Sequence, residues 1–260
     1  MSRNHAEAAP DSRYTRHRSL LSDAAWRRIS ELQVLVAGVG GLGSNVLQIL
    51  TRLAPVSLEL WDPGVLDEPD LNRQILYRPA DLGRRKIELA AREVAAINPD
   101  VSVHVHAEAI TPESFVAAHG SATAPERPLP DVIMDCLDSF QARAGLEAIR
   151  REYRIPVIHG GIEGWYGQVC LFPAEGRGYA SVYGPDYGSL PPAGKPMMPH
   201  VVTTVAALEV GLLIDWVEAA GDAAGLNGMY VFDGRSRSMD RIELASGLGE
   251  DSDGSDREDG

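Results

Sequence analysis

The chain has 260 residues, of which 44% are hydrophobic and 23% charged, and its formal net charge is −13. This size suits one large α/β domain or two small ones, and the apolar content is typical of a globular protein. The negative charge argues against sequence-independent binding to nucleic acid, which requires positive potential. No apolar run of about 18 residues occurs, and the polar N-terminus lacks the apolar core of a secretory signal. We therefore expect a cytoplasmic protein without a membrane-spanning segment.

Both ends of the chain differ in composition from the rest. Residues 1–12 are polar and predict a flexible arm. Residues 246–260 are rich in Asp, Glu, Gly and Ser, with Arg257 as their only basic residue. Such a segment cannot bury apolar area, so we expect it to be a disordered acidic tail. Residues 13–245 are expected to form a single domain.

Apolar runs alternate with amphipathic segments in the first half of the chain. The expected elements are a helix over 23–30, a strand over 32–37, a helix over 44–53, a strand over 56–61, a helix over 84–97 and a strand over 101–106. A polar loop separates the second strand from the next helix and extends to about Pro79. Asn98 and Pro99 end the helix over 84–97, because the residue before proline disfavours helical backbone.

The same alternation continues to about residue 160. The expected elements are a short helix over 111–119, a surface loop over 120–130, a strand over 131–135, a helix over 141–153 and a strand over 156–159. Strands and helices in this order predict an α/β fold, in which a mostly parallel sheet is covered by helices on both faces.

After Gly160 the pattern changes. We expect a strand over 168–172, a long loop rich in Gly and Pro over 173–199, a strongly apolar helix over 201–217, and two closing strands over 229–232 and 237–244. The apolar helix is expected to be a core or dimer helix, too short and too interrupted to span a bilayer.

A glycine-rich turn lies directly after the first strand and opens a helix. Gly38 permits a tight turn, Gly40 and Gly41 let the backbone approach a phosphate, and Gly43 lets the helix pack on the strand. The helix N-terminus adds free N–H groups and a positive dipole end. Asp62 follows 19 residues after Gly43, at a strand end where an acid binds ribose hydroxyls. By itself this pattern does not separate NAD, FAD and ATP.

Two cations close to this turn favour a triphosphate. Arg73 follows the second strand, and Lys86 lies on the next helix. A dinucleotide dehydrogenase does not need them, whereas charge that develops on phosphates during nucleotidyl transfer is offset by cations and Mg²⁺. The alternative for Lys86 alone is a solvated helix face.

Two carboxylates follow the fourth strand. Asp135 and Asp138 fall at the carboxyl end of the predicted sheet, where ligands bind in open α/β folds. One of them is well placed to hold Mg²⁺, which prefers carboxylate oxygen. The alternative is that Asp138 caps the following helix.

Other reactive side chains have structural interpretations. Cys136 and Cys170 lie in apolar stretches and are predicted to be buried thiols, and two cysteines cannot form a four-cysteine zinc site. His159 ends a strand and is interpreted as a satisfied core histidine. His104 and His106 alternate on a strand and need not bind metal.

Taken together, these motifs resemble the ThiF/MoeB/HesA family, bacterial relatives of the ubiquitin-activating enzymes. The resemblance extends from about residue 13 to residue 244. The motifs that carry it lie at residues 13–16, 38–44, 62, 71–74, 86, 135–138 and 159–168.

The resemblance implies an activity, a fold and partners. It implies a homodimer that binds ATP and Mg²⁺, adenylates the C-terminal Gly-Gly carboxylate of a small ubiquitin-like sulfur carrier protein, and releases pyrophosphate. It also implies a Rossmann-like, mostly parallel sheet, extended by C-terminal mixed or antiparallel strands. The loop over about 173–199 resembles the crossover loop that covers the carrier tail.

Residue roles follow from the matching motif positions. The resemblance implies that Gly41 contacts the phosphates and that Asp62 binds the ribose. It implies catalytic roles for Arg73 and Lys86 on the phosphates, for Asp138 on Mg²⁺ and for Arg16 on the ATP of the partner subunit. The other positions that it assigns to the nucleotide site are Gly38, Gly40, Gly43, Asp70, Asn72, Gln74 and Leu137.

The chain departs from the family pattern at several positions. Asp70 and Ser139 each replace a usual Asn, and a carboxylate at position 70 repels phosphate unless it is paired or bound to metal. Many relatives carry two Cys-x-x-Cys pairs that bind structural zinc, where this chain has residues 178–181 and 235–238 instead. We therefore expect a form without zinc and without a thioester on the enzyme.

Three alternatives stay open at this point. A nicotinamide-dependent oxidoreductase shares the glycine turn and Asp62 but leaves Arg73, Lys86 and Asp138 unexplained. A non-catalytic nucleotide-binding scaffold is compatible with Asp70 and the missing zinc ligands. Adenylation of a small molecule or a tRNA keeps the chemistry and changes the acceptor, although the acidic surface disfavours tRNA.

Overall fold

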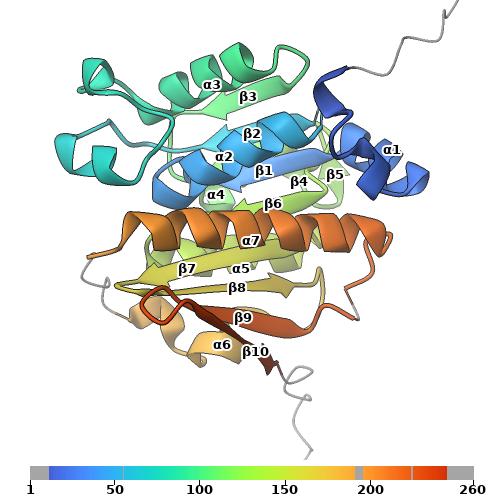
Figure 1. Cartoon of the computed structure of the whole chain (residues 1–260). Coiled ribbons are helices and arrows are strands. Elements are labelled where there is room, and N and C mark those ends of the chain that lie inside the picture. Colours follow the sequence, from blue (N-terminus) through green and yellow to red (C-terminus); the bar gives the residue numbers. More distant parts are fainter. Residues whose placement is uncertain (1–11, 55, 191–195, 224, 245–260) are drawn as a thin grey trace, which may run out of the picture.

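The computed structural model describes residues 12–54, 56–190, 196–223 and 225–244. The predicted N-terminal arm, apart from Ser12, and the predicted acidic tail lie outside these residues. An eight-stranded sheet forms the centre of the molecule, in the order β10-β9-β8-β7-β6-β1-β2-β3 (Figure 1). A mostly parallel sheet with antiparallel C-terminal strands confirms the predicted fold class.

The parallel half of the sheet follows the predicted alternation. It contains β1 (Gln33–Ala37), β2 (Ser57–Trp61), β3 (Ser102–His106), β6 (Val132–Asp135) and β7 (Val157–Glu163). Parallel neighbours need crossover connections. The connecting helices are α2 (Gly41–Leu53), α3 (Lys86–Ile97), α4 (Pro112–His119) and α5 (Phe140–Tyr153).

The antiparallel half begins with a hairpin that the sequence shows only in part. Strand β7 continues to Glu163 and β8 (Tyr166–Phe172) returns beside it, whereas we expected strands over only 156–159 and 168–172. Glycines in both strands weaken the strand signal. Strands β9 (Gly228–Asp233) and β10 (Ser238–Glu243) then complete the sheet.

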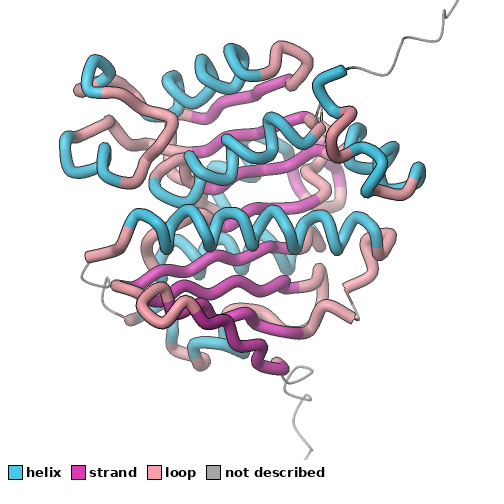
Figure 2. Tube along the Cα trace, in the orientation of Figure 1, coloured by secondary structure: helices cyan, strands magenta, loops and turns pink. Residues whose placement is uncertain are grey.

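Helices cover both faces of the sheet (Figures 1 and 2). The face toward the viewer carries α1 (Asp23–Glu31), α2, α3 and α7 (Pro199–Glu218), and the opposite face carries α4, α5 and α6 (Ala180–Tyr183). Along β1, Val34 and Val36 point to the first face and Leu35 and Ala37 to the second, as the period of two in a strand requires.

Helix α7 corrects one expectation from the sequence. With 20 residues and a mean hydropathy of 1.5, it is long and apolar enough to cross a membrane, so the prediction that it was too short and too interrupted was wrong. It packs against α2, β7 and β8 as the core helix that we also predicted. Among the described residues no other helix meets this criterion of length and composition.

Several predicted loops contain short elements. The segment after β2 holds 3-10 helices at Glu68–Asn72 and Pro79–Asp81, and the loop over 120–130 holds the two-stranded sheet of β4 (Gly120–Ser121) and β5 (Ala124–Pro125). The segment over 173–199, of which residues 191–195 are not described, holds α6 and the 3-10 helix Tyr187–Ser189. Local caps start such turns; the Asp67 side chain, for example, accepts from the Glu68 N–H.

Candidate nucleotide site

A cavity of about 730 Å³ lies at the carboxyl ends of the parallel strands. Its volume is within the range of small-molecule sites. Strand β1 has β2 on one side and β6 on the other, so the strand order reverses here, and ligands bind at such switch points. Most of the predicted site residues line this cavity, namely Gly38, Gly40, Gly41, Asp62, Asp70, Arg73, Gln74, Lys86, Leu137 and Asp138.

The glycine turn has the geometry that its sequence predicts. Gly38 has a φ of +90°, and a Cβ on it would lie 2.9 Å from the carbonyl oxygen of Cys136. A Cβ on Gly43 would lie only 2.0 Å from the carbonyl oxygen of Gly38, so helix and strand pack more closely than any side chain allows. Helix α2 begins at Gly41, and its first N–H groups are available to an anion in the cavity.

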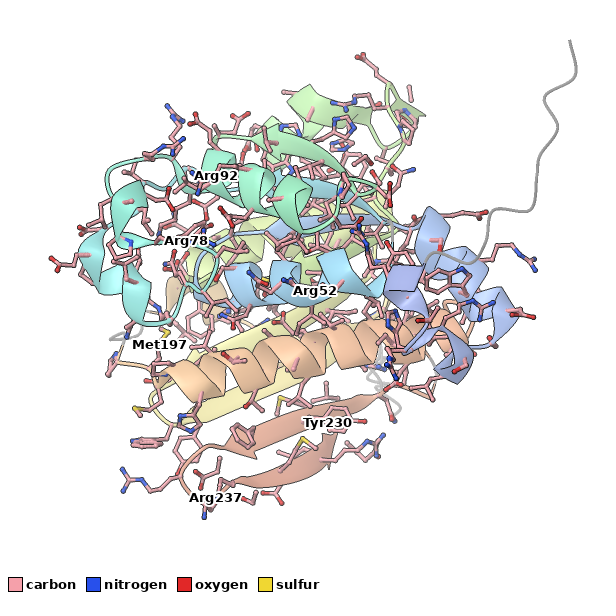
Figure 3. The ribbon with its side chains drawn as sticks, turned by 45° about the horizontal axis from the view of Figure 1, so that its top comes forward. Arg52, Arg78, Arg92, Met197, Tyr230 and Arg237 are labelled. Atoms are coloured by element: carbon pink, nitrogen blue, oxygen red, sulfur yellow. The ribbon has the colours of Figure 1, made fainter. Side chains whose placement is uncertain are left out.

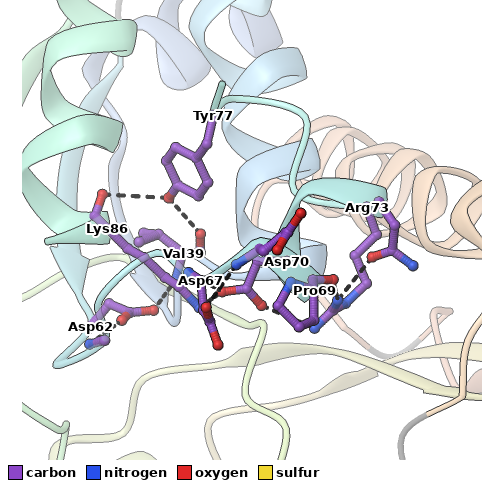
Figure 4. A network of polar contacts seen from close by, with 11 residues as sticks. Val39, Asp62, Asp67, Pro69, Asp70, Arg73, Tyr77 and Lys86 are labelled. Carbon is purple, nitrogen blue, oxygen red and sulfur yellow. Dashed lines mark hydrogen bonds and ion pairs between the residues drawn. The ribbon is translucent and has the colours of Figure 1, made fainter. Parts of the chain in front are cut away.

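The Val39 peptide in this turn is held on both sides (Figure 4). Its N–H donates to Asp62 Oδ2 at 2.8 Å, and its carbonyl accepts from the Tyr77 hydroxyl at 2.7 Å. The other oxygen of Asp62 accepts from the Gly64 N–H at 2.6 Å. Burial raises the pKa of Tyr77, so this phenol stays protonated as a donor. Sequence reasoning missed Tyr77, which lies 38 residues from its partner.

The two predicted phosphate cations converge on one carboxylate. Lys86 Nζ lies 2.8 Å from Asp70 Oδ2, and Arg73 Nη2 lies 3.4 Å from Asp70 Oδ1. Arg73 also donates to the Pro69 carbonyl at 2.9 Å and to the Asn72 side chain at 3.0 Å. Asp70 is therefore paired, which meets the condition under which a carboxylate is tolerated near phosphate.

Two amide side chains support this wall of the cavity. Asn45 donates to the carbonyls of Gly41 at 2.8 Å and Arg73 at 3.0 Å, and it accepts from Thr203 of α7 at 2.8 Å. Gln74 is buried, and its amide oxygen has no hydrogen-bond partner among the described residues. Because a buried polar atom is seldom left unpaired, Gln74 favours a ligand donor in the cavity.

The two acids at the carboxyl end of β6, Asp135 and Asp138, have separate roles. Asp135 is fully buried and accepts from Leu137 N–H, Arg143 Nε, His159 Nδ1 and the Tyr179 hydroxyl at 2.6–3.1 Å. Burial alone would raise its pKa, but Arg143 and these hydrogen bonds lower it to about 2.

Asp138, rather than Asp135, therefore lines the cavity. The alternative in which Asp138 caps α5 is wrong, because the Ser139 side chain accepts from the Ala142 N–H as the cap.

The structural interpretations of His159 and the cysteines are confirmed. The buried His159 ring bonds to Asp135 through Nδ1 at 2.7 Å and to the Tyr183 hydroxyl through Nε2 at 2.7 Å. Cys136 and Cys170 are buried free thiols, and burial raises both pKa values. In the described part of the chain no group of three or more His, Cys, Asp and Glu side chains could hold a metal ion.

The two segments that we compared with zinc-binding Cys-x-x-Cys pairs contain no cysteine and make other contacts. In residues 178–181, Tyr179 is buried and its hydroxyl donates to Asp135 at 2.6 Å. In residues 235–238, the Arg235 guanidinium lies 5.0 Å from the Trp165 ring centroid. The hydrogen bond of Tyr179 connects residues 178–181 to Asp135 of β6.

Three predicted residues do not reach the cavity. Gly43 acts through packing, and Asn72 is exposed. Arg16 is exposed as well, and the adjacent His17 bonds to the Leu53 carbonyl at the end of α2 opposite to the glycine turn. Because α2 is roughly 20 Å long by its rise per residue, Arg16 lies far from the cavity of its own chain.

The fold and this cavity define the class: a Rossmann-like α/β protein whose glycine turn suits a phosphate-bearing ligand. The comparison with known proteins is more specific. The ThiF family model matches residues 14–248, and the chain belongs to that family of E1-like adenylating enzymes.

Curated relatives agree with this assignment. The chain is 30% identical over 223 residues to the SAMP-activating enzyme E1 of Haloferax volcanii, and the aligned region covers 82% of this chain and 79% of that protein. It is 34% identical over 142 residues to ubiquitin-like modifier-activating enzyme 5 of Drosophila willistoni, covering 53% of this chain and 34% of that protein. The probable adenylyltransferase/sulfurtransferase MoeZ of Mycobacterium tuberculosis is 30% identical over 163 residues, covering 62% of this chain and 40% of MoeZ. The chain thus spans well under half of the last two relatives.

Solved structures support the fold. The crystal structure of Escherichia coli MccB with ATP has a TM-score of 0.74, covering 92% of this chain and 74% of that chain. The identity is 19%, so the likeness concerns the fold alone.

Proposed function

We propose that the protein is an ATP-dependent adenylyltransferase that activates the C-terminal glycine carboxylate of a small ubiquitin-like sulfur carrier protein. The observation that carries this proposal is the placement of Arg73 and Lys86 on the cavity wall beside the glycine turn. Cations at that place suit a triphosphate, whereas a dinucleotide pyrophosphate is held by backbone N–H groups alone. Family membership supports the same chemistry, and we accordingly set the oxidoreductase alternative aside.

The chain's own residues bind and orient the nucleotide in this proposal. The N–H groups at the start of α2 and the side chains of Arg73 and Lys86 hold the phosphates. Asp62, at the end of β2, accepts from the ribose. Gln74 supplies a further polar contact through its unpaired oxygen.

Magnesium fits the same cavity. Mg²⁺ in nucleotide sites is held by one or two carboxylates together with substrate phosphates, so the single carboxylate of Asp138 suffices. When bound, the ion offsets the charge that develops on the phosphates. Asp135 does not compete for it, because four donors from the chain surround its carboxylate.

The reaction is a nucleotidyl transfer. A carboxylate oxygen of the carrier attacks the α-phosphorus and forms a new P–O bond, while the bond to the bridging oxygen of the β-phosphate breaks and pyrophosphate leaves. A terminal carboxylate is ionised at neutral pH, so no general base is needed. Catalysis then depends on positioning and on charge stabilisation.

The acceptor enters from the other half of the sheet. The cavity continues past Gly161 and Gln168 to Met197, which precedes α7 (Figure 3). The crossover loop over about 173–199 covers the carrier tail in this proposal. A cytoplasmic homodimer, in which Arg16 reaches the site of its partner, completes the assembly.

The experiment compares cavity variants with a matched surface variant. We expect Arg73→Ala and Lys86→Ala to abolish pyrophosphate release while keeping the melting temperature of the parent protein. Arg52→Ala is the control, because Arg52 is exposed on α2 outside the cavity (Figure 3). Full turnover by either cavity variant contradicts the role assignment. Calorimetry with ATP plus Mg²⁺ and with NAD⁺ tests the nucleotide, and ATP binding without turnover supports the scaffold alternative.

A further inference from the structure

A chain of hydrogen bonds connects the buried centre of the sheet with the acceptor half of the cavity. It begins at Asp135, passes through His159 at 2.7 Å and ends at the Tyr183 hydroxyl, again at 2.7 Å. Asp135 and His159 are fully buried, whereas Tyr183 is half-buried and lines the cavity. The nucleotide chemistry proposed above makes no use of Tyr183.

The protonation of the buried groups fixes the direction of these bonds. The ionised Asp135 can only accept, so His159 Nδ1 must carry the proton between them. Burial lowers the pKa of His159, which outweighs the opposing effect of Asp135, so the ring is neutral and Nε2 carries a lone pair. His159 Nε2 therefore accepts the hydroxyl proton of Tyr183.

A second contact fixes which hydrogen bonds the Tyr183 hydroxyl can make. The Gln168 side-chain N–H donates to the Tyr183 oxygen. The hydroxyl proton is thus committed to His159, and the oxygen faces the cavity as an acceptor. The Phe140 ring packs edge-on at 4.9 Å between centroids and fixes the orientation of Tyr183.

Gly161 keeps this oxygen accessible. A Cβ at position 161 would lie 3.2 Å from the Tyr183 oxygen and 3.2 Å from Gln168 Nε2. Because residue 161 has no side chain to crowd the hydroxyl, and because both residues line the cavity, a ligand donor in the cavity can approach the Tyr183 oxygen to hydrogen-bonding distance. Of the atoms at the end of a peptide chain, an amide N–H can donate there, whereas an ester oxygen meets only repulsion.

We infer that Tyr183 is a specificity-determining residue that accepts a hydrogen bond from a backbone N–H near the end of the acceptor chain. This inference rests on the proposed adenylation of a carrier tail and deepens it. The site therefore selects an acceptor with peptide linkages, and it does so through a tyrosine whose proton is turned away from the ligand.

The probe is a stable mimic of the acyl adenylate, acetylglycylglycine joined to adenosine through a 5′-sulfamate. Two analogues replace one or the other peptide N–H by an ester oxygen. By calorimetry we expect the parent protein to bind the amide about five- to tenfold more tightly than one of the ester analogues. Tyr183→Phe keeps the ring and is expected to reduce this difference to within about twofold.

Two controls separate the possible results. Tyr166→Phe alters a second tyrosine of the cavity that is 58% exposed, and it is expected to retain the discrimination. 5′-Sulfamoyladenosine tests the nucleotide half alone. If it fails to bind, the proposed function is contradicted together with this inference. If it binds but the protein does not distinguish amide from ester, or Tyr183→Phe still does so, the inference alone is overturned.

Discussion

Asp70 links the two cations of the cavity wall, at 2.8 Å from Lys86 and 3.4 Å from Arg73. In the absence of an anion it keeps both side chains pointing into the cavity. The same negative charge opposes a triphosphate that approaches these cations. We therefore expect Asp70 to orient the two cations and to lower the affinity for a nucleotide.

Replacing this carboxylate is expected to strengthen nucleotide binding. Asp70→Asn retains an oxygen that accepts from Lys86 but removes the charge, so calorimetry with Mg²⁺ and ATP should give a Kd lower by about three- to tenfold. Glu68→Gln removes an exposed charge from the same 3-10 helix and should leave the Kd unchanged. Weaker binding by Asp70→Asn would contradict this expectation and assign Asp70 to the metal.

Sequence analysis found site residues whose role depends on local backbone geometry, and it missed those whose role depends on contacts between distant segments. Gly38 and Gly43 were predictable because a strand-turn-helix connection imposes its chemistry locally. The pairing of Asp135 with His159 was not, because it arises from neighbouring positions on β6 and β7, and a sequence does not show that register. Tyr77 was missed because it reaches the Val39 carbonyl from a loop 38 residues further along the chain, and no local pattern shows such a contact.

At the scale of elements, α7 packs against β7 through an unusual contact. Glu209 of α7 is fully buried and faces Gly160, where a Cβ would lie 2.5 Å from the carboxyl carbon. Neither carboxyl oxygen has a hydrogen-bond partner within the described residues. Burial, with a contribution from the charge of Asp135 that Arg143 partly offsets, raises the pKa of Glu209 well above its ordinary value of 4.5.

This contact makes stability depend on pH. Below pH 4.5 Glu209 is protonated in both states; above it, only the unfolded state ionises. The protein is therefore expected to lose stability as pH rises toward the folded-state pKa, by up to about 1.4 kcal/mol per pH unit. Glu209→Met removes this loss. The variant's free energy of unfolding in urea, relative to that of the parent protein, should therefore be more favourable at pH 7.5 than at pH 5. Asp215→Asn, at an exposed site of α7, should show no such trend.

Elements were predictable where apolar runs alternate with amphipathic helices, which covers the parallel half of the sheet. They were less predictable where the chain uses glycine for close packing. Gly160 and Gly167 lie in the β7–β8 hairpin, opposite Glu209 and Val205 of α7. Because glycine is typical of loops, the sequence predicted shorter strands here than the structure has. Tertiary packing decided these strands, not local propensity.

At the scale of the whole molecule, Arg16 lies far from the cavity of its own chain, and we propose that it serves the site of a second copy. We expect Arg16→Ala and Lys86→Ala to be inactive separately. Co-expression should restore roughly a quarter of the parent activity, because half of randomly assembled two-fold dimers are mixed and each has one intact site. Pairing Arg73→Ala with Lys86→Ala, which alter the same cavity, should restore nothing. Full activity of Arg16→Ala alone contradicts the role in trans.

Arg143 joins the two halves of the cavity. Its guanidinium donates to the carbonyl of Leu137, a residue of the proposed nucleotide site, at 2.7 Å, to the carbonyl of Gly160 on β7 at 3.0 Å, and to Asp135 at 3.1 Å. A displacement of either carbonyl is therefore expected to move the Arg143 guanidinium and to change its hydrogen bond to the other carbonyl. We expect the two ligands to be linked thermodynamically: whatever factor the nucleotide adds to the affinity for the acceptor, the acceptor must add to the affinity for the nucleotide. Titration of each ligand in the presence of the other measures that factor, and Arg143→Lys, which loses the fork of donors, should bring it close to one.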